Sequence, residues 1–287
     1  MTPRDLVVDA HHHFWDPAAA DYPWMTDELA RIRRRFAPED LEPLLGPAGV
    51  DATVVVQTRS SLDETREFLR VAAATTFVRG VVGWTDLTDA AVADTIAELR
   101  AGAGGERLVA IRHQVHDEPD ADWLRRADVR RGIAAVGEAG LVYDLLLRPR
   151  ELPAALDTVR ALPAVRFVID HLAKPPIRDG ELEPWASLIR PFGREPHVWA
   201  KVSGMVTEAD WESWTPADLA PYVDIAIETF GPQRLLVGSD WPVCLLAGSY
   251  GEVLEAARSL LARLGPDERA AILGGNALKV YGLTAGA

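Results

Sequence analysis

The sequence has few of the features that direct a chain to membranes or to disulfide-stabilised folds. Its 287 residues include a single cysteine, Cys244, so an internal disulfide is excluded. No apolar run approaches the roughly 18 residues that a membrane-spanning helix needs. The N-terminus lacks a basic segment followed by an apolar one, as a signal peptide would have. These absences predict a cytoplasmic protein that has no membrane partner.

Positive charge is also scarce. Thirty Lys and Arg residues stand against 43 Asp and Glu, which gives a net charge of -13, and the longest basic run is Arg33-Arg34-Arg35. A chain of this charge repels nucleic-acid phosphates, so a nucleic-acid partner is not expected. The sequence carries no signal for a particular oligomeric state.

What the chain does contain is a regular series of short apolar runs. They are rich in Val, Ile and Leu and show little alternation, which is typical of strands covered on both faces. The eight runs span 6–13, 53–58, 77–84, 108–115, 141–147, 166–172, 198–204 and 235–242.

Helical patterns separate these runs, among them 89–101, 128–139, 217–230 and 250–264, with Thr215-Pro216 and Gly231 as the start and stop signals of one helix. Eight strand–helix alternations in one chain without a linker predict a single-domain α/β fold over residues 1–287, a (β/α)8 TIM barrel. An open doubly wound sheet is the rival, but no glycine-rich loop follows the first strand. Residues 14–52 are expected to form a loop and a short helix over the barrel mouth.

Polar side chains gather where the predicted strands end. In a barrel of this kind the chemistry lies at the C-terminal ends of the strands. The residues at those ends are His11 and His13, Gln57, Arg112 and His113, His171, and Asp240.

His11 and His13 are two positions apart, so they share a face of the strand, and His12 should point to the helical layer. Imidazoles that face a carboxylate can hold a divalent metal, or a water molecule with its base. The His-x-His pair alone fits two structural histidines equally well. His171 and Asp240 at matching strand ends favour a functional site.

These residues carry a resemblance to a known family. The motifs are DAHHHFW at 9–15, IDHLAKP at 169–175 and GSDWP at 238–242, with further stretches at 82–87, 111–115, 143–149, 201–204 and 275–277. The chain resembles the amidohydrolase superfamily from Val7 to Gly282. Within it, the chain is most similar to the sugar-lactone hydrolases that act on fuconolactone and rhamnonolactone, which are related to 2-pyrone-4,6-dicarboxylate lactonase.

The resemblance implies a (β/α)8 barrel in which His11, His13, His171 and Asp240 are catalytic and form the metal site if a metal is bound. Members with two metals use a carboxylated Lys or a Glu on strand four and a His on strand five. Here strand four offers Arg112 and His113, and strand five offers Asp144. We therefore expect either one divalent ion, with zinc as the favoured metal, or no metal.

The predicted activity is opening of a sugar lactone by water, with Asp240 as general base and the histidines polarising the carbonyl. The predicted substrate contacts are Arg112, His113, Gln57, Lys174, Trp15 and Trp241. For Arg112 and Lys174 a purely structural ion pair is an equal alternative. Asp144 is expected to face outward in a structural role, and Cys244 to be a buried, inert thiol.

Three alternatives stay open at this point. The nearest is a metal-dependent decarboxylase of an aromatic or muconate-type acid on the same barrel. A catalytically silent barrel that binds a sugar acid is disfavoured, because the complete His, His, His and Asp set is present. Amide hydrolysis would need a more strongly activated site.

Overall fold

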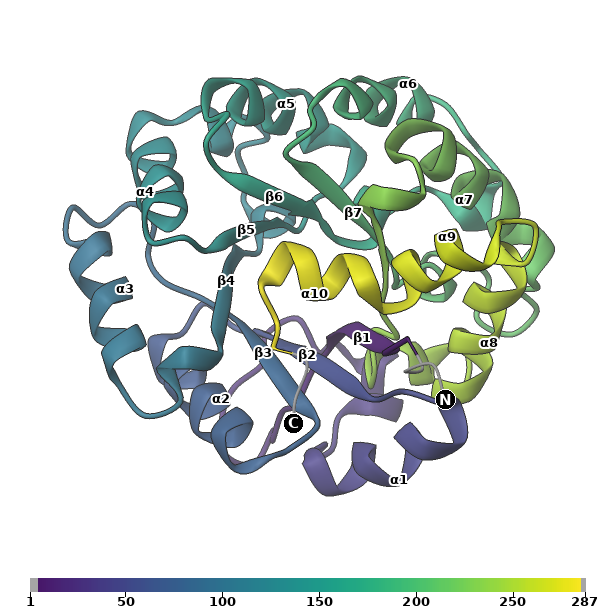
Figure 1. The fold of residues 1–287 in the computed structure, drawn as a ribbon, viewed down its shortest axis with the longest axis horizontal. Coiled ribbons are helices and arrows are strands. Elements are labelled where there is room, and N and C mark those ends of the chain that lie inside the picture. Colours follow the sequence, from purple (N-terminus) through teal and green to yellow (C-terminus); the bar gives the residue numbers. More distant parts are fainter. Residues whose placement is uncertain (1–4, 285–287) are drawn as a thin grey trace.

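Eight short strands form the wall of a barrel in the computed structural model, which describes residues 5–284 (Figure 1). All seven neighbouring pairs are parallel and follow the order of the chain from β1 to β8. The strands are β1 Val8–His12, β2 Ala52–Val56, β3 Val78–Gly83, β4 Leu108–His113, β5 Val142–Leu145, β6 Arg166–Ile169, β7 Val198–Val202 and β8 Leu235–Val237. The predicted (β/α)8 TIM barrel is confirmed.

The ring closes between β1 and the segment that follows β8. The Asp240 amide donates to the His11 carbonyl at 2.8 Å, and the His13 amide donates to the Trp241 carbonyl at 2.6 Å. These two bonds tie both ends of the sheet together at its carboxyl side. They also hold Asp240 beside the two first-strand histidines.

A ring of helices covers the outside of the barrel (Figure 1). The longer ones are α1 Pro38–Ala48, α2 Leu62–Ala74, α3 Val92–Ala101, α4 Ala127–Glu138, α5 Leu152–Ala161, α7 Pro216–Phe230 and α8 Tyr250–Leu261; the shorter ones are α6 Trp185–Ile189, α9 Pro266–Ala270 and α10 Asn276–Tyr281. Helix α7 begins and ends where its Thr-Pro and Gly signals predict. None of the helices in the described part of the chain is long and apolar enough to cross a membrane.

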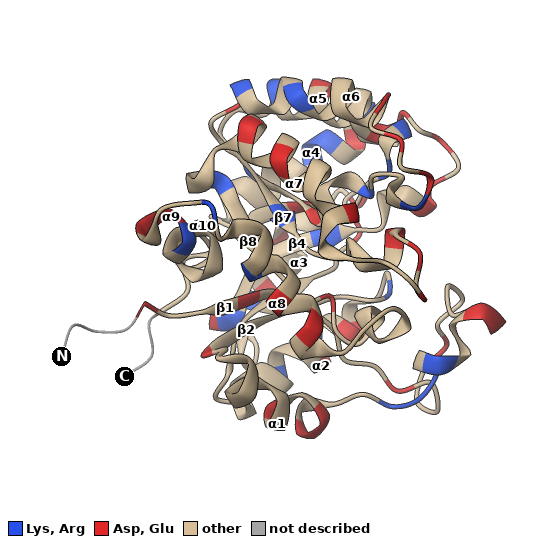
Figure 2. Ribbon diagram, turned by 90° about the vertical axis from the view of Figure 1, so that its right-hand side faces the viewer, with Lys and Arg blue, Asp and Glu red and all other residues tan. Residues whose placement is uncertain are grey.

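Two apolar layers hold the barrel together. The larger lies between the strands and the outer helices, and the smaller fills the barrel interior. Helix α10 contributes Ala277, Val280 and Tyr281 to this inner layer, so the amino ends of the strands are closed by the C-terminal helix (Figure 1). Charged residues of both signs are spread over the helices and loops of the outer surface (Figure 2).

Residues 14–52 divide into two parts. The first contains a short 3₁₀ helix, η1, at Asp27–Ile32, and the second is helix α1. Helix α1 packs against α8 in the outer ring. Trp24 and Leu29, in contrast, line a cavity at the carboxyl end of the barrel. Of this segment, the part before α1 is therefore the one that reaches the mouth.

Each strand is shorter than the apolar run that predicted it, and for two strands this moves a site residue out of the strand. Strand β6 ends at Ile169 and β8 at Val237, so His171 and Asp240 lie in the turns that follow and not within strands. The reason is the backbone conformation, because His171 has φ 53° and Asp240 has φ 57°, which no strand accommodates.

Candidate active site at the carboxyl ends of the strands

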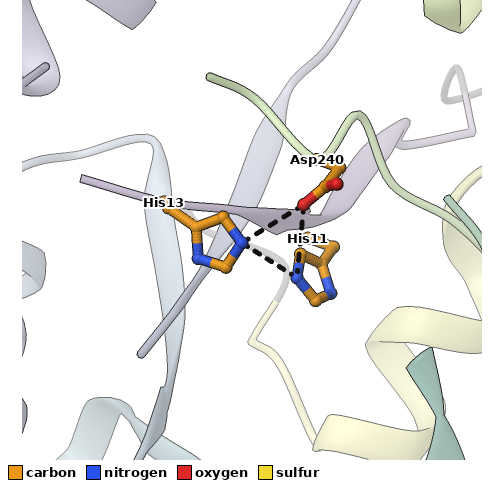
Figure 3. A group of neighbouring side chains, drawn as sticks. All are labelled: His11, His13 and Asp240. Carbon is orange, nitrogen blue, oxygen red and sulfur yellow. Dashed lines mark hydrogen bonds and ion pairs between the residues drawn. The ribbon is translucent and has the colours of Figure 1, made fainter. Parts of the chain in front are cut away.

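Three histidines and one aspartate converge at the carboxyl end of the barrel. His13 Nε2 lies 3.2 Å from both His11 Nε2 and Asp240 Oδ1. The distances from Asp240 Oδ1 to His11 Nε2 and to His171 Nε2 are both 3.8 Å. Figure 3 shows His11, His13 and Asp240 pointing at one another. Side chains more than 200 residues apart in the sequence thus meet at one point, and each is at least 95% buried.

The middle histidine of the run points the other way. His12 Nε2 lies 2.8 Å from Thr53 Oγ1, and the His12 ring packs edge-on against Phe14. Phe14 in turn contacts Phe68 on helix α2, so this side of β1 faces the helical layer. Alternation along the strand accounts for the different surroundings of the three histidines.

Hydrogen bonds at the far side of each ring fix its orientation. His13 Nδ1 lies 2.7 Å from the Val56 carbonyl, which only accepts, so His13 donates from Nδ1. His171 Nδ1 lies 2.9 Å from Ser203 Oγ, and His11 Nδ1 lies 3.3 Å from Asp170 Oδ1. All three Nε2 atoms face the Asp240 carboxylate.

Burial sets the charge state of this group. Burial lowers the pKa of His171 to about 4 and that of His11 well below its ordinary value. Burial alone would raise the pKa of Asp240, but the neighbouring imidazoles of His171, His13 and His11 hold it well below its usual range. At neutral pH the site therefore presents the neutral imidazoles of His11 and His171 and one carboxylate, which are the forms that bind metals.

The donor set fits one divalent ion. The candidate ligand atoms of His11, His13 and Asp240 all lie within 4.8 Å of one another, and imidazole nitrogens with a carboxylate oxygen are typical zinc ligands. A cation between these three side chains would be held by two imidazoles and one carboxylate. One divalent metal at this position is consistent with the predicted cofactor.

A left-handed turn brings His171 into the site. His171, Leu172, Ala173 and Lys174 have φ values of 53°, 50°, 59° and 51°. Each non-glycine residue in this conformation costs roughly 1–2 kcal/mol. The Lys174 amide donates to the His171 carbonyl at 2.8 Å, and the buried Trp185 indole donates to the Leu172 carbonyl at 2.7 Å. Surrounding contacts thus hold a strained turn, as is common at functional sites.

Arg112 is fixed beside the imidazoles. Its Nη1 donates to Asp170 Oδ2 at 2.9 Å, and its Nη2 donates to the Gln57 side-chain oxygen at 2.8 Å and to the Gln57 carbonyl. Arg112 lines the cavity although only 3% of its surface is exposed. Gln57, fully buried, acts by holding the guanidinium.

A buried ionic network under the site was not predicted. Lys201 Nζ lies 2.7 Å from Asp144 Oδ2, 2.9 Å from Asp170 Oδ1 and 3.3 Å from His11 Nδ1. Tyr281 of helix α10 donates to the same Asp144 oxygen at 2.7 Å. The prediction that Asp144 faces outward is wrong, because Asp144 follows Val142 on the inner face of β5. Burial raises the pKa of Asp144 to about 6 although Lys201 opposes the shift.

Asp9 is a further buried residue near the site that the sequence analysis did not single out. Its carboxylate accepts from the Ser239 amide at 2.8 Å, the Ser239 hydroxyl at 2.6 Å and the Tyr250 hydroxyl at 3.1 Å. Asp9 thereby holds the segment that carries Asp240. Burial raises its pKa to about 6 against the effect of these donors.

The other predicted substrate contacts divide into two groups. Lys174 lines the cavity and pairs with Glu208 at 3.0 Å. His113 lies among side chains of the outer layer, where it stacks on Trp123 with ring centroids 4.3 Å apart and bonds to Glu118. Trp15 and Trp241 both pack against Phe36 in the apolar core, and neither is part of the cavity lining.

A cavity of about 450 Å³ opens above the converging side chains, and His13, Arg112, His171 and Asp240 lie in its lining. Its size falls within the range of small-molecule sites. The remaining lining comes from loops that follow the strands, which is where barrels of this kind bind their ligands.

The fold and this site define a class of protein, a (β/α)8 barrel with one metal-type centre at the carboxyl ends of its strands. More narrowly, the chain belongs to the amidohydrolase family, whose sequence profile matches residues 8–283. The chain is 41% identical over 281 residues to the L-fucono-1,5-lactonase of Burkholderia ambifaria, covering 96% of this chain and 94% of that protein.

Two solved structures extend the comparison. An amidohydrolase from Burkholderia multivorans, crystallised with bound zinc, matches with a TM-score of 0.92 and 38% identity and covers 97% of this chain and 100% of that one. The 5-carboxyvanillate decarboxylase LigW of Sphingomonas paucimobilis matches at 14% identity with a TM-score of 0.64, covering 98% and 100% of the two chains. The likeness to the decarboxylase shows the shared fold alone.

Proposed function

We propose that this protein is a lactonase that uses water to open the ring of a sugar lactone, an aldonolactone such as L-fuconolactone or L-rhamnonolactone. The observation that carries the proposal is the convergence of His11, His13, His171 and Asp240 at the base of a cavity of about 450 Å³. The 41% identity to a curated L-fucono-1,5-lactonase supports the same substrate class.

Asp240 is the general base in this proposal. It is ionised at neutral pH and lines the cavity, so it accepts a proton from an attacking water and returns it to the departing ring oxygen. Its low pKa makes it a weak base on its own. One zinc ion held by His11, His13, His171 and Asp240 would supply an acidified water and polarise the carbonyl.

The surrounding residues orient these groups. Ser203, Asp170 and the Val56 carbonyl hold the three imidazoles with Nε2 toward the reacting water. Arg112 donates to Gln57 and Asp170, and its Nη1 also lies 3.4 Å from His11 Nε2, so it contributes a fixed positive charge near the carbonyl oxygen and the carboxylate product. Preorganised electrostatic groups of this kind are typically worth about 3 kcal/mol per donor.

The test is a panel of aldonolactones assayed with a pH indicator, before and after treatment with a chelator. Lactone opening releases an acid, whereas a decarboxylase would release carbon dioxide from an aromatic acid. We expect Asp240→Asn to lower kcat by about a thousandfold or more, and Asp63→Asn, an exposed aspartate on α2, to keep wild-type activity. Near-normal turnover of Asp240→Asn would remove the proposed base.

A further inference from the structure

The cavity has an apolar wall on the side of β1 and β8. Trp24 and Leu29 come from the loop after β1, and Val243 and Leu246 come from a short 3₁₀ helix, η11, at Val243–Leu246 after β8. The two segments pack together, and Arg31 Nη1 donates to the Leu246 carbonyl at 3.1 Å. The Trp24 indole N–H donates to a backbone carbonyl, so its one polar group is already engaged.

The opposite wall, formed by the loops after β4 to β6, is rich in donors and acceptors. Lys174 pairs with Glu208 at 3.0 Å, and His116 pairs with Asp117 at 3.3 Å. Gln114, Arg148 and Leu146 lie on the same side, whereas Thr207 and Trp211, in the segment after β7, adjoin η11 and the apolar wall. Donors and acceptors that lie side by side suit the adjacent hydroxyls of a sugar ring, since each hydroxyl both donates and accepts.

The reacting groups lie between the two walls. His13 belongs to the β1 side, His171 to the β6 side and Asp240 to the turn after β8. A lactone whose carbonyl carbon lies over Asp240 must therefore turn one edge to the apolar wall and the other to the polar wall. Because the cavity is two-sided, it constrains which edge of the substrate goes where.

We infer that the apolar wall receives the methyl group of a 6-deoxysugar lactone, and that Val243 and Leu246 are specificity-determining residues. This inference rests on the proposed function and adds the part of the sugar that the cavity selects. In a 1,5-lactone the methyl group stands on the carbon beside the ring oxygen, and the hydroxyls stand on the other ring carbons. Methyl and hydroxyls therefore occupy different edges of the ring, as the two walls require.

Three lactones of one ring stereochemistry test the inference. L-Fucono-1,5-lactone carries CH₃ at this carbon, L-galactono-1,5-lactone carries CH₂OH, and D-arabinono-1,5-lactone carries only hydrogen. A hydrophobic contact with one carbon discriminates by roughly 10- to 200-fold, and an added hydroxyl at an apolar wall costs up to about 100-fold. We expect kcat/KM for the methyl compound to exceed that for each of the other two by at least about tenfold.

A conservative variant locates the selectivity. Val243→Thr keeps the shape of the side chain and adds a hydroxyl to the wall, so the preference for CH₃ over CH₂OH should fall about threefold or more. Val71→Thr, a half-buried valine of helix α2 outside the cavity, makes the same chemical change and should leave that ratio unchanged. Circular dichroism and thermal unfolding of both variants verify that they are folded.

The outcomes separate the inference from the proposed function. If the wild-type protein opens the CH₃ and CH₂OH lactones with kcat/KM values within about twofold, the inference is overturned and the lactonase proposal stands. The same holds if Val243→Thr leaves the ratio unchanged. If none of the three lactones is opened, the proposed function fails for this substrate class, and the inference fails with it.

Discussion

Gly204 offers a direct test of how the site depends on the position of one imidazole. Gly204 follows β7 with φ 58°, and a Cβ built there would clash with His171 Nδ1 and lie 2.7 Å from His171 Cγ. Alanine at this position would destabilise the fold by about 1–2 kcal/mol because of the left-handed backbone. Overpacking against His171 would add about 1–3 kcal/mol. The imidazole must move, and its bond to Ser203 is lost.

Gly140 is the matched control. It has φ 75° and nothing within 4 Å of a built Cβ, so Gly140→Ala is destabilised by the left-handed backbone alone. We expect Gly204→Ala to be less stable than Gly140→Ala by about 1–3 kcal/mol in urea unfolding. We also expect kcat/KM for lactone opening to fall by about a hundredfold in Gly204→Ala, while Gly140→Ala stays near wild type. Equal stability and equal activity of the two variants would refute this account of the His171 position.

Three further predictions concern charge and metal. Lys201→Met leaves the buried Asp144 carboxylate without a cation and removes one of the two cations beside Asp170, so it should cost about 3–5 kcal/mol in urea unfolding. Arg66→Met breaks an exposed pair and should cost under about 1 kcal/mol. Zinc titration by calorimetry should show one bound equivalent, and Asp240→Asn should weaken the affinity by at least about tenfold. Burial lowers the pKa of His12 to about 3, so between pH 6.5 and 3 the unfolded chain binds a proton that the folded chain excludes. Stability should therefore fall with falling pH by about 1.4 kcal/mol per unit from this residue, and His12→Gln should show a slope smaller by about one proton.

The barrel could be predicted from the sequence because its signals are local. Eight apolar runs alternate with helical periodicities, and the parallel order follows from connections long enough for a crossover. His11 and His13 were found by alternation within one strand, and His171 and Asp240 by their place at the ends of later runs. The family resemblance gave these four residues their common role.

The buried network was missed because its members look isolated in the sequence. Asp144 and Lys201 each stand alone within an apolar strand, and only the closed barrel places them 2.7 Å apart. The available signal was alternation, since Asp144 shares a face with Val142 inside the barrel. His113 lies outside the cavity lining for a related reason: Arg112 and His113 are adjacent on β4, so they point to opposite faces of the strand.

The charges inside the barrel favour one divalent ion over two or none. Around the site the buried charged groups are the carboxylates Asp9, Asp144, Asp170 and Asp240 and the cations Arg112 and Lys201, an excess of two negative charges when all are ionised. Unbalanced charge is costly in a buried site. A single divalent cation at the three imidazoles and Asp240 balances the excess, whereas a second ion would reverse it. Lys201 and Arg112 lie among Asp144, Asp170 and Gln57, so these fixed cations already neutralise the carboxylates that would otherwise attract another metal.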